Sequence, residues 1–417
     1  MGSSVAGLAA ADALRALGFD GSVILLGAER RTPYDRPPLT KAVLAGRQTP
    51  AECALRAEGW AADLDLDLRL GTTATGLDLG RRTVEVDSGP PVAFDRLVVA
   101  TGSTPRTLAL GGRRLEGVFT LRTMDEALAI RSAIGAGAKV VVVGGGFIGA
   151  EVAATARRLG AEVTILEADQ APLARALGSQ IGSLLARIHA DEGIAVRCGV
   201  PVADLEGETR IERVRLADSA AIDADVVIVG LGARPATEWL EGSGLEIRDG
   251  VVCDAFCRAS APGVVAAGDA ARWEHPRLGS IRIEHWENAV TQGRAAANAL
   301  LEARPAGPYD PVPYVWSDQY DYKLQLVGLP GLGDDLLVID GQFDERRFLA
   351  LYTRDGRVTA AVAIGRPRAI MRVRRLLRAD VSVSSVIETL AETPKNLPND
   401  GLTAVSPFAK ISSRRNP

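Results

Sequence analysis

Lys139-Val-Val-Val-Val-Gly-Gly-Gly-Phe-Ile-Gly-Ala-Glu151 carries the clearest structural signal in this chain. The β-branched run Val140–Val143 is typical of a parallel strand buried on both faces. Three glycines then complete the motif G-x-G-x-x-G: Gly144, Gly146 and Gly149. Apolar residues at helical spacing follow, and Val163–Leu166 reads as a second strand. Strand, glycine turn, helix and strand in this order predict a dinucleotide-binding unit.

The end of the second strand favours NADH over NADPH. Glu167 lies roughly 20 residues after the glycine turn, where a carboxylate binds the two ribose hydroxyls. A carboxylate there repels a 2′-phosphate, and Ala168 and Asp169 supply no arginine in its place. The alternative is a glycine-rich turn that holds no nucleotide.

A second, altered copy of the motif begins the chain at Gly2-Ser3-Ser4-Val5-Ala6-Gly7. A helical pattern, the strand Val23–Leu26 and Glu29 follow it. Because only Met1 precedes Gly2, we expect this unit to lack its first strand, which suggests an upstream start; a unit without nucleotide is the alternative. Each copy is closed by an apolar strand that ends at glycine and proline, within 96–106 and 225–235. Two such units imply two nucleotides.

Composition excludes several classes of protein. The chain has 417 residues, enough for two or three domains of ~150 residues each. Its net charge of −4 gives no basic field for nucleic acid. No apolar run approaches the ~18 residues of a membrane span, and no signal peptide is recognisable, so we expect a cytoplasmic protein. The four cysteines contain no C-x-x-C pair, and we expect no metal site.

The remaining segments predict further elements. Residues 33–41, with three prolines, are expected to be extended and stiff. Residues 304–313 read as a linker. After it, four short apolar segments predict an antiparallel meander, followed by an amphipathic helix that carries Ile370 and Val373. His189 is expected on the surface of a helix.

Several segments together resemble the FAD-dependent pyridine-nucleotide oxidoreductases, in the ferredoxin/rubredoxin reductase branch that includes putidaredoxin reductase. The resemblance covers nearly the whole chain. Its motifs are Pro-Tyr-Asp-Arg-Pro-Pro-Leu-Thr-Lys at 33–41, Ala-Thr-Gly at 100–102, Leu-Arg-Thr at 121–123, Gly-Gly-Gly-Phe-Ile-Gly-Ala-Glu at 144–151, Gly-Asp at 268–269, Arg-Ile-Glu-His-Trp at 282–286 and Trp-Ser-Asp-Gln-Tyr at 316–320.

The resemblance implies an α/β fold with two Rossmann-like nucleotide-binding domains and a C-terminal α+β domain. The FAD domain would be split between residues 1–106 and 233–306, with the NAD domain, 107–232, inserted between the halves. The C-terminal domain, 307–417, would pack over the flavin.

The resemblance also implies the site. Lys41 and Glu151 would be the catalytic pair, with Lys41 beside the isoalloxazine and Glu151 on the nicotinamide side. The residues expected to hold FAD are Gly2, Ser4, Ala6, Gly7, Glu29, Arg36, Lys41, Ala74, Ala100, Thr101, Gly102, Arg122, Gly268, Asp269, His285, Trp286 and Trp316. Those expected to hold NAD are Gly144, Gly146, Phe147, Ile148, Gly149, Glu151, Glu167, Gly230 and Gly232. One departure is Ala28, where the family has an acidic residue.

The implied activity is that of an FAD-dependent NADH:ferredoxin reductase. NADH would give a hydride to FAD, and single electrons would then pass to a small iron–sulfur protein that serves a cytochrome P450 or a ring-hydroxylating dioxygenase. Arg294 and the arginines between Arg366 and Arg378 are candidates for docking that acidic partner. A monomer or homodimer is expected.

Alternative functions remain at this point. A flavin-dependent NADH oxidase or peroxidase of the same superfamily needs a redox cysteine, and Cys53 lies off the required position. A non-catalytic NAD-binding remnant would result if the FAD site were incomplete.

Overall fold

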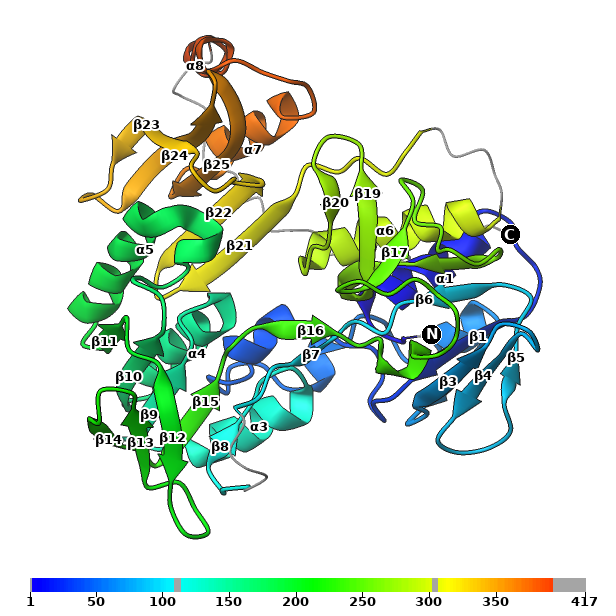
Figure 1. The fold of residues 1–417 in the computed structure, drawn as a ribbon, viewed down its shortest axis with the longest axis horizontal. Coiled ribbons are helices and arrows are strands. Elements are labelled where there is room, and N and C mark those ends of the chain that lie inside the picture. Colours follow the sequence, from blue (N-terminus) through cyan, green and yellow to red (C-terminus); the bar gives the residue numbers. More distant parts are fainter. Residues whose placement is uncertain (1, 109–113, 302–306, 393–417) are drawn as a thin grey trace, which may run out of the picture.

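The computed structural model describes residues 2–108, 114–301 and 307–392, which fold into three parts (Figure 1). Two parts are α/β units, one on each side of the picture, and the third is a sheet with two helices above them. No helix in the described ranges is both long and apolar enough to cross a bilayer.

The second α/β unit along the chain, on the left in Figure 1, contains the predicted strand–turn–helix–strand. Its parallel sheet has the order β11-β10-β9-β15-β8. The strands are β8 (Val118–Phe119), β9 (Lys139–Val143), β10 (Glu162–Glu167), β11 (Ala195–Cys198) and β15 (Val226–Val229). The helices are α3 (Met124–Ala133), α4 (Phe147–Arg158) and α5 (Ala174–Asp191), and a small antiparallel sheet adds β12 (Val202–Glu206), β13 (Arg213–Leu216) and β14 (Ala221–Asp223). Because β9 lies between two neighbours, Val140–Val143 is buried, as predicted.

The first α/β unit combines residues from the two predicted halves of the FAD domain, 1–106 and 233–306. Strand β6 (Leu97–Val99) pairs in parallel with β18 (Val264–Ala266), and β7 (Ser103–Pro105) pairs with β16 (Ala233–Pro235). Helix α1 (Val5–Ala16) packs on α6 (Trp286–Leu300). The remaining elements are β1 (Val23–Gly27), η1 (Pro37–Thr40), η2 (Ala51–Cys53), α2 (Trp60–Asp63), β2 (Leu66–Leu70), β3 (Ala74–Asp78), β4 (Thr83–Val86), β5 (Val92–Ala93), η3 (Glu238–Leu240), β17 (Val251–Cys253), η4 (Gly268–Ala270), β19 (Ala271–His275) and β20 (Gly279–Ile281). The exact domain boundaries stay a prediction.

The two glycine turns occupy equivalent places in their sheets. The Gly144 N–H donates to the Leu166 carbonyl at 2.7 Å, and the Gly2 N–H donates to the Leu26 carbonyl at 2.8 Å. In the first unit, however, β1 pairs with β2 and β6 pairs with β18, and no strand of the described residues joins the two pairs. In the second unit β9 makes that connection. The missing first strand stays a prediction.

The C-terminal part is a five-stranded antiparallel sheet in the order β21-β22-β25-β24-β23. Its strands are β21 (Tyr314–Gln319), β22 (Tyr322–Gly328), β23 (Asp335–Gln342), β24 (Arg347–Arg354) and β25 (Arg357–Ile364). The prediction of a simple meander is wrong, because β22 pairs with β25 rather than with β23. Helix α7 (Pro367–Leu376) buries Ile370 and Val373, as its pattern predicts, and α8 (Val383–Ala391) follows.

Two local expectations are corrected. The proline-rich segment is not extended throughout, because Pro37–Thr40 forms the 3-10 turn η1, with prolines at its first positions. His189 does lie on a helix, α5, but it is fully buried. Its i−4 and i−8 neighbours, Leu185 and Ile181, are also buried, so His189 belongs to the apolar face of that helix.

Candidate functional site

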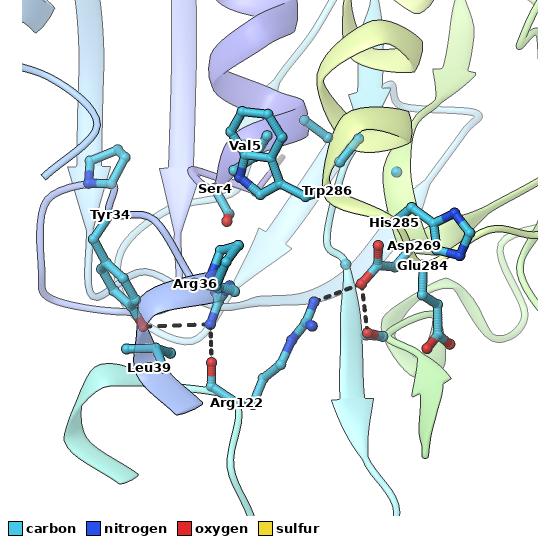
Figure 2. Close-up of a pocket in the computed structure, with 18 of the residues that line it drawn as sticks. Ser4, Val5, Tyr34, Arg36, Leu39, Arg122, Asp269, Glu284, His285 and Trp286 are labelled. Atoms are coloured by element: carbon cyan, nitrogen blue, oxygen red, sulfur yellow. Dashed lines mark hydrogen bonds and ion pairs between the residues drawn. The ribbon is translucent and has the colours of Figure 1, made fainter. Parts of the chain in front are cut away.

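A cavity of about 320 Å³ lies where the three parts meet. Its walls come from the first glycine turn, the β6 end, the 29–41 segment, helix α4, the α6 start and β21. Figure 2 shows that Ser4, Arg36, Arg122, Asp269 and Trp286 surround it from different elements. Such a position, outside the carboxyl ends of parallel strands, is where α/β sheets bind ligands.

The floor of the cavity is the glycine turn at residues 2–7. A Cβ on Gly7 would lie 1.7 Å from the Gly2 carbonyl oxygen, so only glycine permits this approach. Gly149 and Gly144 repeat the same contact at 2.0 Å in the second unit. Ser4 and Gly146 begin helices α1 and α4 without a side-chain cap, which leaves N–H groups directed at the ligand space. Both turns therefore fit the pyrophosphate of a dinucleotide.

Glu29 lines the cavity, although it is displaced from the end of its strand. Leu26 in β1 and Leu166 in β10 accept the same hydrogen bond from the glycine turn, so the next residues, Gly27 and Glu167, are equivalent. The Glu29 carboxylate accepts hydrogen bonds from Arg36 at 2.6 Å and from the Tyr34 hydroxyl. The first unit therefore still has a carboxylate at the cavity wall, that of Glu29, which Arg36 and Tyr34 hold in place.

A buried acid stands at the opposite wall. Asp269, in η4, accepts hydrogen bonds from Arg122 at 2.7 Å and from Ser103 at 2.9 Å (Figure 2). Next to it, burial lowers the pKa of His285 to about 4, and Asp269 offsets only part of that shift. The Nδ1 atom of His285 is buried and has no hydrogen-bond partner among the residues that the structure describes.

Aromatic rings close one end of the cavity. The Trp286 and Trp316 rings meet edge to face with centroids 6.3 Å apart, and Tyr314 stacks on Trp316 at 5.8 Å. The indole Nε1 of Trp286 donates to Asp35 at 2.7 Å. Burial raises the pKa of Asp35, and the hydrogen bond from Trp286 opposes that rise. A planar ring system suits such a wall.

An ion pair joins the two nucleotide units. Lys41 Nζ lies 2.7 Å from Glu151 Oε2, and both residues line the cavity. Glu151, on α4, is only 6% exposed, and it also accepts hydrogen bonds from Thr40 at 2.6 Å and Ser317 at 2.8 Å. A nearly buried carboxylate needs such partners, because desolvation of an unpaired charge is strongly unfavourable.

Most of the predicted FAD residues share this one cavity. The predicted residues that line it are Gly2, Ser4, Ala6, Glu29, Arg36, Lys41, Ala100, Thr101, Gly102, Arg122, Gly268, Asp269, His285, Trp286 and Trp316. Gly7 lies behind the turn and acts through packing, and Ala74 begins β3, away from the lining.

The predicted NAD residues divide into two groups. Phe147, Ile148 and Glu151 line the cavity from α4. The others lie at the second glycine turn and its neighbouring strand ends: Gly144, Gly146, Gly149, Glu167, Gly230 and Gly232. There, Glu167 accepts hydrogen bonds from the N–H groups of Gly145 at 2.8 Å and Asp169 at 2.9 Å.

The residues missed from the sequence are polar partners of the predicted ones. They are Asp35, Thr40, Ser103, Tyr314 and Ser317. Asp35, Thr40 and Ser317 lie inside the motifs quoted for the resemblance, so those motifs could have identified them as site residues.

No cysteine is among the described residues that line the cavity. Burial, with smaller contributions from Asp35 and Glu52, raises the pKa of Cys53 to about 11. Burial also raises the pKa of Cys253 to about 12. Thiols in this state are protonated and unreactive at neutral pH.

Comparison with known protein families gives two matches. The model of the pyridine nucleotide-disulphide oxidoreductases matches residues 1–293, and the reductase C-terminal model matches residues 314–397. The chain belongs to the pyridine nucleotide-disulphide oxidoreductase family. Together, the two matches span both α/β units and the C-terminal sheet.

Relatives within the family are ferredoxin reductases. The chain is 38% identical over 398 residues to the biphenyl dioxygenase system ferredoxin–NAD(+) reductase component of Paraburkholderia xenovorans, covering 95% of this chain and 96% of that one. It is 36% identical over 400 residues to the benzene 1,2-dioxygenase system ferredoxin–NAD(+) reductase subunit of Pseudomonas putida, covering 95% of each.

Solved structures show the same fold. The reductase in the covalent putidaredoxin reductase–putidaredoxin complex matches with a TM-score of 0.88 and 32% identity over 92% of this chain and 94% of that chain. The ferredoxin reductase for the CYP199A2 system of Rhodopseudomonas palustris also matches with a TM-score of 0.88, at 33% identity over 94% of this chain and 98% of that chain. The fold class and the family inferred from the sequence are thereby confirmed.

Proposed function

We propose that this protein is an FAD-dependent NADH:ferredoxin reductase that passes electrons to a small iron–sulfur protein of an oxygenase system. The observation that carries the proposal is the Lys41–Glu151 ion pair, which joins the two nucleotide units at the wall of one shared cavity. The names of the relatives and their near-complete coverage support the same activity.

The residues of the cavity fit FAD. The glycine turn fits a pyrophosphate, because Gly7 allows the close packing of the turn and the first N–H groups of α1 have no side-chain cap. Glu29 is suited to the adenosine ribose, and Asp269 with Arg122 to the polar chain between the pyrophosphate and the ring. His285 has an orphaned buried Nδ1, and Trp286 and Trp316 offer flat surfaces. Bound FAD supplies hydride acceptance from NADH and the release of single electrons.

Lys41 and Glu151 prepare the reacting end of the cavity. The Lys41 ammonium lines the cavity, where its positive charge would stabilise negative charge on a bound flavin ring. The Glu151 carboxylate holds Lys41 in place by the ion pair. Glu151 lies on α4, the helix that follows the glycine turn proposed to bind NADH. Phe147 and Ile148 lie on the same helix and give that side of the cavity an apolar lining.

Direct electron transfer to the acceptor follows from the cavity's composition. The described lining contains no cysteine, and the pKa of Cys53 is raised, so no thiol relay operates from it. This argues against the oxidase and peroxidase alternatives. The acceptor has to dock close to the aromatic end.

The proposed docking surface is basic but smaller than the sequence suggests. Arg374 is tied to Glu287 at 2.6 Å, and Arg366 to Asp340 at 2.5 Å. Arg294 is exposed on α6, the helix that begins with Trp286. We therefore place the docking contact at Arg294, with Arg375 and Arg378, which are exposed at the end of α7 and just after it, as secondary candidates.

Anaerobic titration of the purified protein with NADH tests the proposal. A yellow protein is expected, which NADH bleaches and an added [2Fe–2S] ferredoxin restores. A colourless protein would instead support the NAD-binding remnant. A yellow protein that NADH does not bleach would contradict the role given to the second nucleotide unit.

A further inference from the structure

Behind Glu151 lies a row of buried polar side chains that the reaction described above does not use. Ser317 and Gln319 alternate onto the same buried face of β21, as residues two apart do in a strand. His189 reaches the same interior from α5, and it is fully buried. Polar groups in such a place are unfavourable unless hydrogen bonds connect them.

Hydrogen bonds connect most of this row. Ser317 Oγ donates to Glu151 Oε1 at 2.8 Å, and Gln319 Nε2 donates to Ser317 Oγ at 3.1 Å. At the other end, His189 Nδ1 lies 2.8 Å from the Tyr320 hydroxyl. Two buried atoms between these ends, Gln319 Oε1 and His189 Nε2, have no hydrogen-bond partner among the described residues.

The direction of each hydrogen bond follows from the carboxylate. A carboxylate only accepts, so the single Ser317 hydroxyl proton points to Glu151. Ser317 then accepts from the amide nitrogen of Gln319, and the amide oxygen faces the other way. That oxygen needs a donor, and the other unpartnered buried atom of this row is His189 Nε2. The His189 ring is also the group whose pKa the Gln319 side chain raises. The donor is therefore Nε2–H, because Nδ1 faces the Tyr320 hydroxyl.

We propose that His189 is a positioning residue: as the Nε2–H tautomer it closes a one-way hydrogen-bond chain, Tyr320 to His189 to Gln319 to Ser317, that ends on Glu151. Every proton in the chain points toward the carboxylate. The chain fixes Oε1 of Glu151, while Thr40 and Lys41 hold Oε2. The functional part of this inference rests on the proposed role of the Lys41–Glu151 pair.

The surroundings of His189 support a neutral ring. Burial lowers its pKa to about 4. Three charged groups act on its partner Tyr320: Arg157 and Arg158 at the end of α4, and Glu192 after α5. The Arg158 guanidinium covers the Tyr320 ring at 5.8 Å and binds Asp321 at 2.7 Å, which fixes the outer end of the chain.

Nitrogen chemical shifts of the histidine rings test the tautomer without any activity assay. The chain has three histidines, so ¹⁵N-histidine labelling gives few signals, assignable with His189→Gln and His275→Gln. His275 is an internal standard for the Nε2–H form, because Nε2 donates to the Pro311 carbonyl at 2.9 Å and Nδ1 accepts the Arg277 N–H at 3.2 Å. At neutral pH we expect His189 to show the same form. An Nδ1–H tautomer or an imidazolium at His189 would overturn the proposal.

Two near-isosteric variants test the effect on Glu151. Glutamine carries its amide near the Nε2 position and keeps a donor for Gln319, whereas asparagine reaches only the Nδ1 position. His189→Asn is expected to slow reduction of the bound flavin by saturating NADH about threefold to tenfold, the effect of one lost hydrogen bond between neutral groups. His189→Gln should restore most of that rate, and His275→Gln should leave it unchanged.

A double-variant comparison separates positioning from mere packing. In a Glu151→Gln background, His189→Asn and His189→Gln should give the same rate, because the chain has lost the carboxylate it orients. An equal difference in both backgrounds would show that His189 acts through stability alone. If Glu151→Gln itself leaves the rate unchanged, the proposed role of the ion pair is wrong, and the tautomer measurement alone decides whether the chain exists.

Discussion

Lys41 neutralises a carboxylate that is almost inaccessible to water. Removing one partner of a buried pair leaves the other charge uncompensated, which commonly destabilises a protein by about 3–5 kcal/mol. For Lys41→Met we expect about 3 kcal/mol, at the lower end, because Thr40 and Ser317 still donate to Glu151. Urea unfolding measures this loss. Reduction of the bound flavin by NADH should also slow about 100-fold.

A second substitution separates charge from chemistry at the same pair. Adding Glu151→Leu to Lys41→Met removes the buried charge and should recover most of the lost stability. The rate of flavin reduction should stay low, since the positive charge is still absent. Recovery of the rate together with the stability would mean that Lys41 has only a structural role.

At the residue scale, the sequence predicted the Lys41–Glu151 pair but not the other residues that bind its carboxylate. Lys41 and Glu151 were assigned from motifs, and the structure brings them to 2.7 Å. Their partners Thr40 and Ser317 stand 111 and 166 residues from Glu151, so only tertiary packing reveals the contacts. His189 was misplaced because its polar character outweighed its position on the apolar face of α5.

At the level of elements, the two glycine turns have the same shape, and we assign them to different nucleotides. Gly7→Ala would place a Cβ 1.7 Å from the Gly2 carbonyl oxygen, and Gly149→Ala would place one 2.0 Å from that of Gly144. We expect Gly7→Ala to purify without flavin. Gly149→Ala should stay yellow but show a KM for NADH raised about 100-fold, as expected for a displaced binding turn.

Gly135→Ala is the matched control for both substitutions. No atom lies within 4 Å of the position that its Cβ would take. It should keep flavin and NADH affinity alike. Loss of flavin in Gly149→Ala, or its retention in Gly7→Ala, would contradict the assignment of the two turns.

Elements with local signals were predicted closely, and those that depend on distant pairing were not. Strand β9, helix α4 and strand β10 match the predicted segments within a few residues, because apolar periodicity and the glycine turn define them. The predicted strand order of the C-terminal sheet was wrong, because the pairing of β22 with β25 depends on contacts between residues that are distant in sequence. Nothing in the alternation of a single strand specifies its neighbour.

Across the whole molecule, buried neutral histidines make stability depend on pH. The folded pKa of His189 is about 4, against 6.5 for the free side chain. The unfolded chain therefore takes up a proton first, and stability falls as pH drops from about 6.5 to about 4, by on the order of 3 kcal/mol. His189→Gln should reduce this fall by a comparable amount in urea unfolding at the two pH values. An unchanged slope would show that His189 is not neutral in the folded protein.

The docking surface is also a property of the whole molecule. Arg294→Glu should slow reduction of an acidic ferredoxin at least tenfold at low salt, while ferricyanide reduction stays intact, because charge mainly governs encounter. Arg81→Glu, an exposed position on the β3–β4 turn, is the control and should change neither rate. Equal loss of both activities in Arg294→Glu would contradict docking at this surface.

The central claim is that electrons pass from NADH through the shared cavity to ferredoxin without a cysteine. Replacement of all four cysteines by alanine tests it most directly, with NADH reduction of the bound flavin in the same sample as the check of folding. We predict that the variant reduces ferredoxin with NADH at a rate close to that of the unaltered protein. A variant whose flavin is still reduced by NADH but which no longer reduces ferredoxin would contradict the account.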